Sequence, residues 1–165
     1  MSAKRDIRIF IKSERYEVDA SLFSEELSQD ILYAVAERES AEPEKMQIKT
    51  EGTFTVTDDG KVQISYDETE LTGMEGSSTV VSFDMREPDT VTMIRTGSVS
   101  TTLVFEKGKR HHCVYSTPYM PFEVCVRTLD VANGLGDGGK LSIDYIVEIR
   151  GARAERTKFS MRIMD

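Results

Sequence analysis

Hydrophobic and polar residues alternate along most of this chain. Val62, Ile64 and Tyr66 occupy every second position, and the same period of two recurs in residues 141–149 and 159–163. Alternation sends successive side chains to opposite faces of a strand, so one face is buried and the other is wet, as in antiparallel sheets. The pattern predicts a first strand containing Ile7, Ile9 and Ile11, followed by strands at 46–56, 62–66, 79–83, 90–95, 99–105, 110–115, 122–126, 141–149 and 159–163.

Short turn sequences separate these strands. Asp58-Asp59-Gly60 is typical of a hairpin, Lys107-Gly108-Lys109 joins two strands, and the stretches LTGMEGSS (71–78) and NGLGDGG (133–139) are rich in glycine. Short strands at regular spacing indicate a sandwich or an up-and-down barrel. We favour the barrel, because consecutive hairpins form a meander and a closed meander has no exposed strand edges. The prediction is therefore an all-β antiparallel barrel of eight to ten strands.

One segment breaks the alternation. In SLFSEELSQDILYAVAERES (21–40), the residues Leu27, Ile31, Leu32 and Val35 fall on one face of a helix, and Ser24 can cap its start. We expect a helix at about residues 25–37, within an insertion at about 21–41. Its apolar stripe could cover its own domain, close one end of the barrel or bind a partner.

Composition narrows the class of protein. The 165 residues are 39% hydrophobic and 30% charged, which predicts one globular domain over residues 1–165. No apolar run is long enough to cross a membrane, and MSAKRDIRIF lacks the apolar core of a signal peptide, so we expect a cytoplasmic protein. The formal charge of −8 argues against nucleic-acid binding. Cys113 and Cys125 are too few for a disulfide framework and are expected to be free thiols.

Three stretches carry a family resemblance. YDETELTGMEGSST (66–79), IRTGSVSTTLVFEKGKRHHCVYSTPY (94–119) and GGKLSIDY (138–145) resemble the bacterial DUF1934 family of YwiB-like proteins. The likeness covers roughly residues 45–164 and the first strand. It implies a calycin-like barrel, related in shape to the lipocalins. It implies no known activity, because the family is functionally uncharacterised and offers no catalytic residues.

Strand alternation also predicts which polar residues enter the lumen of the barrel. If Val91 and Met93 point inward, so does Arg95, and if Val62 to Tyr66 point inward, so do Glu68 and Glu70. Arg95 would either bind the anionic group of a small ligand or pair with one of the two carboxylates, since a buried charge needs a partner. The candidate ligand-binding residues of the lumen are Arg95, Glu68, Glu70, Tyr66, Met93, Phe105, His111, Tyr115, Phe122 and Tyr145.

The run KRHHCVYS (109–116) holds both histidines and one cysteine. A three-residue turn before it would point His111, Cys113 and Tyr115 inward and His112 outward, and a two-residue turn would reverse this. In either case His111 and His112 face opposite sides and cannot readily bind one metal ion. No zinc motif completes a ligand set, and neighbours on a strand rarely give a thiolate its activating base. We therefore expect no metal, no cofactor and no catalytic residue here.

The expected function is that of a non-enzymatic barrel, with a small, partly apolar ligand that has an acidic end. The alternative is a closed barrel that acts as a homodimer or through a protein partner, and an enzyme ranks third. A binding barrel needs a cavity that reaches solvent near Arg95. An interaction protein needs a filled lumen and an exposed apolar patch.

Overall fold

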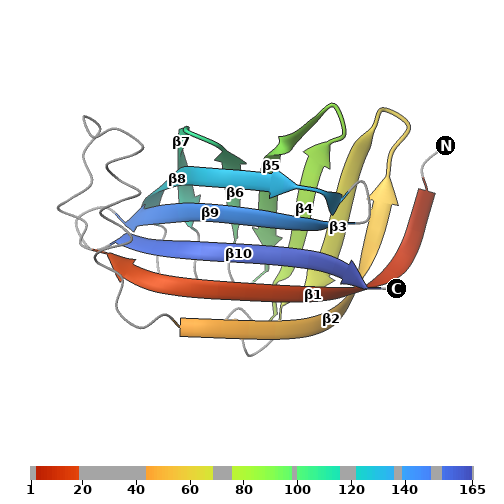
Figure 1. Cartoon of the computed structure of the whole chain (residues 1–165), viewed down its shortest axis with the longest axis horizontal. Coiled ribbons are helices and arrows are strands. Elements are labelled where there is room, and N and C mark those ends of the chain that lie inside the picture. Colours follow the sequence, from red (N-terminus) through yellow and green to blue (C-terminus); the bar gives the residue numbers. More distant parts are fainter. Residues whose placement is uncertain are drawn as a thin grey trace.

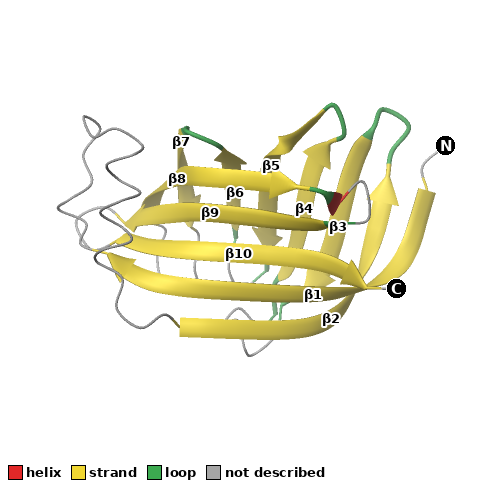
Figure 2. Ribbon diagram, in the orientation of Figure 1, coloured by secondary structure: helices red, strands yellow, loops and turns green. Residues whose placement is uncertain are grey.

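The computed structural model describes residues 3–18, 44–68, 76–97, 100–115, 122–135, 139–149 and 154–164. Strands dominate this part of the chain (Figures 1 and 2). Among the described residues, no helix has the length and hydropathy needed to cross a membrane. The strands are β1 (Ala3–Val18), β2 (Glu44–Val56), β3 (Lys61–Asp67), β4 (Ser78–Asp84), β5 (Glu87–Thr96), β6 (Thr101–Glu106), β7 (Arg110–Tyr115), β8 (Phe122–Asn133), β9 (Lys140–Ile149) and β10 (Ala154–Met164).

All ten strands belong to one antiparallel sheet that curls into a nearly closed barrel. Their order is β6-β5-β4-β3-β2-β1-β10-β9-β8-β7, so strands adjacent in sequence pair with each other and β1 pairs with β10 to join the two halves. The predicted all-β antiparallel barrel is confirmed. The predicted helix at about 25–37 and the insertion at 21–41 lie outside the described residues.

The barrel has one seam, between β6 and β7. These strands are the two ends of the sheet order, and no ladder joins them within the described residues. Their connecting turn is nevertheless fixed, because the Lys109 N–H donates to the Glu106 carbonyl (2.9 Å) and the Gly108 N–H donates to the Thr128 carbonyl on β8 (3.0 Å). The Glu106 N–H also donates to Thr128 Oγ1 (3.3 Å). Thr128 therefore holds the turn end of the seam.

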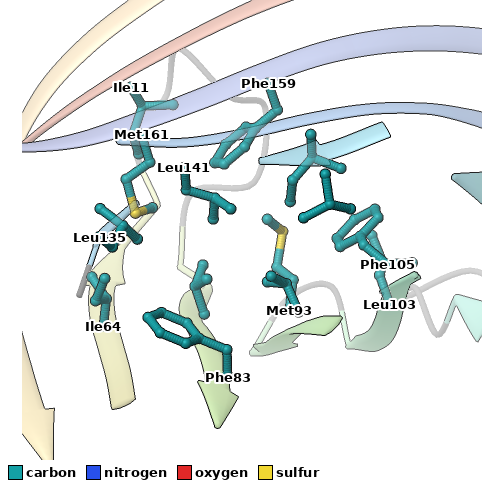
Figure 3. Packing of buried hydrophobic residues seen from close by; sticks show 14 of the residues in the cluster. Ile11, Ile64, Phe83, Met93, Leu103, Phe105, Leu135, Leu141, Phe159 and Met161 are labelled. Atoms are coloured by element: carbon teal, nitrogen blue, oxygen red, sulfur yellow. The ribbon is translucent and has the colours of Figure 1, made fainter. Parts of the chain in front are cut away.

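Apolar side chains fill the interior between the two walls of the sheet. Phe159 and Met161 on β10 point toward Ile64, Phe83 and Met93 on the opposite wall (Figure 3). Members of this cluster are 0–8% exposed, as expected for the inner face of a small barrel. The buried cluster comprises Ile7, Ile9, Ile11, Ile48, Val62, Ile64, Tyr66, Val81, Phe83, Val91, Met93, Leu103, Phe105, Val126, Val131, Leu135, Leu141, Ile143, Tyr145, Phe159 and Met161.

One end of the barrel is closed by the chain after β8. The Asn133 amide donates to the Pro88 carbonyl at the start of β5 (2.7 Å), and Asn133 Oδ1 accepts the Leu135 N–H (3.1 Å). Leu135 is 3% exposed and joins the apolar cluster. The sequence predicted that the strand after residues 79–83 begins at residue 90, but β5 begins at Glu87. The turn lies at Met85 and Arg86, and Pro88 is already part of β5.

Candidate functional site

The two ends of the barrel differ in their connections. At one end the strands are joined by tight turns, at residues 57–60, 85–86 and 107–109. At the other end β1, β3, β5, β7 and β9 stop and the described chain is interrupted. Polar side chains of the inner face gather at this second end, which we call the Arg95 end. The interruptions there are residues 19–43, 69–75, 98–99, 116–121 and 150–153.

Arg95 and Glu68 form an ion pair on the inner face. Strand alternation carries Val91, Met93 and Arg95 inward on β5, and Glu68 follows Tyr66 at the end of β3. Arg95 Nε lies 3.5 Å from Glu68 Oε1, and the two side chains are 12% and 2% exposed. Thr79 Oγ1 donates to the same carboxylate oxygen at 2.5 Å. Because an isolated buried charge is costly, these two contacts offset the cost of burying the Glu68 side chain.

Two tyrosines border this pair. Burial raises the pKa of Tyr66 above its ordinary range, the Glu68 carboxylate raises it further, and Arg95 opposes both effects. Burial also raises the pKa of Tyr145, again against the influence of Arg95. Both hydroxyls are therefore neutral near pH 7 and able to donate hydrogen bonds. The Tyr145 ring also packs on Phe105, with ring centroids 4.7 Å apart, which links the polar end to the apolar core.

A second ion pair lies at the rim of this end. Arg15 Nε is 3.7 Å from Glu155 Oε2, and the side chains are 49% and 28% exposed. Arg15 pairs in register with Thr157, which hydrogen-bonds Tyr145. Our sequence reasoning missed Arg15 and Glu155. The inward alternation of Ile7, Ile9 and Ile11, continued along β1, would have led to Arg15.

The other predicted site residues are distributed differently. Met93 and Phe105 are 1% and 0% exposed and belong to the packed interior. Tyr115 and Phe122 pair in register between β7 and β8, but their side chains are not among those described. Glu70 lies outside the described residues. Of the predicted residues, the structure thus brings Arg95, Glu68, Tyr66 and Tyr145 together.

The histidines and the cysteine of KRHHCVYS lie on β7. His112 is exposed, whereas Cys113 packs against the apolar cluster. In the described sheet β7 pairs only with β8, and His111 lies opposite Val126. His111 Nε2 lies 3.5 Å from Glu106 Oε1 across the seam.

This arrangement offers no activated thiol. Burial raises the pKa of Cys113, opposed by a hydrogen bond with Thr101, and burial likewise raises the pKa of Cys125. Both groups are therefore thiols rather than thiolates near neutral pH. Among the described residues, no three His, Cys, Asp or Glu side chains are placed to hold a metal ion.

A groove of about 1020 Å³ lies on the outer side of β1 to β4. Its lining is mostly polar and includes Asp6, Arg8, Glu51 and Asp67, with Tyr66 contributing from the sheet itself. Alternation places Arg95 on the opposite, inner face of the sheet. The groove is therefore separate from the lumen at the Arg95 end.

Comparison with known proteins assigns the family. The family model described as a domain of unknown function, DUF1934, matches residues 32–161. The chain belongs to the DUF1934 family. This confirms the resemblance drawn from the sequence. No curated protein matches the chain.

A solved structure supports the fold of this DUF1934 chain. The crystal structure of the ywiB protein from Bacillus subtilis is similar to it, with a TM-score of 0.62 and 17% sequence identity. The match covers 99% of this chain and 96% of that chain. At this identity the likeness shows the fold alone. Neither the description of the family nor the name of this neighbour states an activity, so the function must be argued from this chain's own residues.

Proposed function

We propose that this DUF1934 protein is a non-enzymatic binding barrel that holds the anionic group of a small, partly apolar ligand at the Arg95 end. The observation that carries the proposal is the placement of Arg95, Glu68 and two neutral tyrosines at one end of an otherwise apolar interior. A guanidinium fork suits a carboxylate or a phosphate, and tyrosine hydroxyls add hydrogen-bond donors. Binding residues also concentrate where connecting segments meet a rigid scaffold.

The filled interior limits the depth of such a site. Met93, Leu103 and Phe105 occupy the lumen beyond Arg95 and are at most 1% exposed. The ligand would therefore stay near the end of the barrel rather than run through it. Its anionic group would compete with Glu68 for Arg95, because two carboxylates beside one guanidinium repel each other.

This competition predicts opposite effects for the two partners of the ion pair. Arg95→Met should abolish binding of an anionic ligand, whereas Glu68→Gln should strengthen it. The first measurement is native mass spectrometry of the protein purified from its own host. A stoichiometric adduct that is lost in Arg95→Met and retained in Glu68→Gln supports the proposal. An adduct of equal occupancy in the wild type and in folded Arg95→Met would sink it.

A second candidate function rests on the packed lumen itself. With the interior filled, a closed barrel would act through its outer surface, as a homodimer or with a protein partner. Large exposed hydrophobic side chains among the described residues are Met85, Ile94 and Val114. A mass of twice the chain weight without any adduct, under the same gentle conditions, would favour this function over ligand binding.

A further inference from the structure

The outer side of β2, β1, β10 and β9 carries a basic surface, and these four strands lie side by side (Figure 1). On β1 the isoleucines on either side of Phe10 are buried, so Phe10 and Lys12 point outward. Phe10 lies in register with Lys49 on β2 and with Arg162 on β10. Arg162 in turn lies opposite Lys140 on β9. This row and the row next to it form what we call the Phe10 face: Phe10, Lys12, Gln47, Lys49, Lys140, Ser142, Ser160 and Arg162.

The Phe10 face is positively charged although the protein is acidic. Its eight residues include four exposed cations and no carboxylate, whereas the whole chain has a formal charge of −8. Lys12 Nζ lies 5.7 Å and Arg162 Cζ lies 5.8 Å from the centroid of the Phe10 ring. Cation–π attraction therefore holds two of the four cations beside the ring. Adjacent strands are about 4.8 Å apart, so the row of Lys49, Phe10, Arg162 and Lys140 spans about 14 Å across four strands.

Two shallow hollows border the Phe10 face. One has a volume of about 350 Å³ and is lined by Lys12 and Ser160 of this face and by Glu14. The other has a volume of about 340 Å³ and is lined by Lys49 and Glu51. Each hollow thus combines a cation with hydrogen-bond acceptors. A ligand that fits this surface needs anionic groups for the cations and N–H donors for the acceptors.

We propose that the Phe10 face binds single-stranded nucleic acid. In this complex the cations contact phosphates, and the accessible part of the Phe10 ring contacts a base. N–H groups of neighbouring bases donate to the acceptors in the hollows. The face is part of the convex exterior of a barrel, so a flexible single strand can follow it. A duplex is convex as well and keeps its bases stacked on each other, so it touches less of this surface and offers the ring no base.

The argument from charge in the sequence concerned the chain as a whole, whereas binding depends on the charges close to the ligand. Interactions between exposed charges are largely screened beyond about 10 Å at 0.1 M ionic strength. The four cations of the Phe10 face therefore act on a phosphate in contact with them, while distant carboxylates act weakly.

Other anionic partners fit the Phe10 face less well. An acidic peptide gains affinity by pairing its backbone with a sheet edge, but β1, β10 and β9 each have a neighbouring strand on both sides. A membrane surface requires apolar side chains that insert among the lipids, and the Phe10 ring is partly buried between cations. Nucleic acid needs neither a free sheet edge nor a projecting apolar side chain.

Fluorescence anisotropy with the full-length protein tests the proposal. The probe is a labelled oligodeoxythymidylate of about twelve nucleotides, a length that a single-strand site can cover. Lys49→Gln with Arg162→Gln should weaken binding about tenfold or more at low salt. The double variant should also reduce the slope of log K against log salt concentration by about 1.4, because each lost phosphate contact removes about 0.7. The matched control Lys61→Gln with Lys109→Gln removes the same charge from exposed positions beside the tight turns and should change neither quantity.

Variants of Phe10 distinguish the base contact from the charge of the face. Phe10→Ala should weaken binding about fivefold or more with little change in the salt slope, because stacking of a base on an aromatic ring involves no phosphate. Phe10→Tyr keeps the ring and should bind like the wild type. Thermal unfolding followed by circular dichroism checks that each variant is folded. If Phe10→Ala does not fold, the exposed pair Lys49 and Arg162 decides.

Several results would overturn the proposal. No binding by the wild type at low salt, or equal losses in the two double variants, would mean that the Phe10 face is an ordinary solvated surface. A duplex of the same length that binds as tightly as the single strand would show that Phe10 contacts no base. An oligoglutamate peptide of equal charge that displaces the probe more effectively than unlabelled oligonucleotide would assign the face to an acidic protein. Displacement by vesicles containing phosphatidylserine in the same comparison would assign it to a membrane surface.

Discussion

At the level of single residues, the ion pair of Arg95 and Glu68 is buried on the inner face of the barrel. Removing one partner leaves the other as an uncompensated buried charge. We expect Arg95→Met to lower the free energy of unfolding by about 3–5 kcal/mol, as for other broken buried pairs. Arg86→Met is the matched control, because Arg86 contacts Asp84 at 2.8 Å but is 76% exposed. Urea denaturation followed by circular dichroism measures both variants.

The double variant Arg95→Met/Glu68→Leu distinguishes the ion pair of Arg95 with Glu68 from the packing of the Arg95 side chain. It removes both charges at once, so much of the lost stability should return. A double variant no more stable than Arg95→Met alone would mean that Arg95 stabilises the barrel by packing and not through Glu68.

Tyr66 makes stability depend on alkaline pH. Its pKa in the folded state is raised above the ordinary value of 10.0 by burial and by Glu68. Below pH 10.0 the phenol keeps its proton in both the folded and the unfolded state. Above it the unfolded chain ionises first, so the native state binds more protons and its stability falls as pH rises from 10.0 through the folded pKa. Tyr66→Phe should therefore lose less stability between pH 8 and about 11 than the wild type.

The titration of Tyr66 is isolated by comparing how steeply stability falls with pH in the two proteins, rather than by comparing their stabilities at one pH. Tyr66→Phe also changes a hydrogen bond with Thr79, which affects stability at every pH. Urea midpoints at a series of pH values give the slope for each protein. Parallel curves for the wild type and Tyr66→Phe would show that the phenol does not titrate differently in the folded state.

At the level of elements, Gly52 lets β2 and its neighbours pack closely. β1 and β2 both curve strongly along their length (Figure 1). A Cβ atom at Gly52 would lie 2.5 Å from the Ser65 carbonyl oxygen and 2.6 Å from Ile9 Cδ1. We expect Gly52→Ala to destabilise the fold by about 1–3 kcal/mol, because the sheet backbone must shift. Thermal unfolding measures this change.

Gly134→Ala is the control for this substitution. The nearest atom to a Cβ there is the Lys140 carbonyl oxygen at 3.5 Å, which is ordinary contact. We expect a change of no more than about 0.5 kcal/mol at this position. Equal losses at the two glycines would mean that the close approach at Gly52 is relieved without cost.

The strand boundaries show which parts of the fold the alternation of hydrophobic residues could predict. Alternation located β3, β4 and β9 because each has one buried and one wetter face. It missed the second half of β8, since Val124 to Leu129 are buried without interruption and the register shifts between Thr128 and Asp130. Alternation likewise identified Arg95 and Glu68 as inward. Which residues these side chains contact, Thr79 with Glu68 and Arg15 with Glu155, depends on cross-strand register, which one strand's pattern does not contain.

At the level of the whole molecule, the strands of the barrel differ in how many hydrogen-bonded neighbours they have. β1 is hydrogen-bonded to β2 on one side and to β10 on the other over most of its 16 residues. β6 and β7, in contrast, each have a partner on one side only in the described sheet. The turn sequence Lys107-Gly108-Lys109 suggested an ordinary hairpin. The turn is formed, but the N–H groups of Glu106 and Gly108 beside it donate hydrogen bonds to Thr128 on β8.

This asymmetry should appear in amide hydrogen exchange. Amides of β1 and β10 should exchange slowest, at the rate of global unfolding, because opening them separates the two halves of the sheet. Amides of β6 that point into the seam should exchange faster by local opening. The Glu106 amide should be the exception, since it is held by Thr128 Oγ1.

Thr128→Val tests the role of the seam contact. The substitution keeps the shape of the side chain but removes the acceptor, so the Glu106 amide should exchange faster. Leaving one amide unsatisfied should lower the free energy of unfolding by about 1–2 kcal/mol. The amides of β1 and β10 should therefore change only by this loss in global stability. Nuclear magnetic resonance resolves these sites separately. If seam amides of β6 instead exchange as slowly as those of β1 in the wild type, a ladder closes the barrel in solution. The seam would then be as stable as the rest of the sheet, and Thr128 would have no special part in holding it.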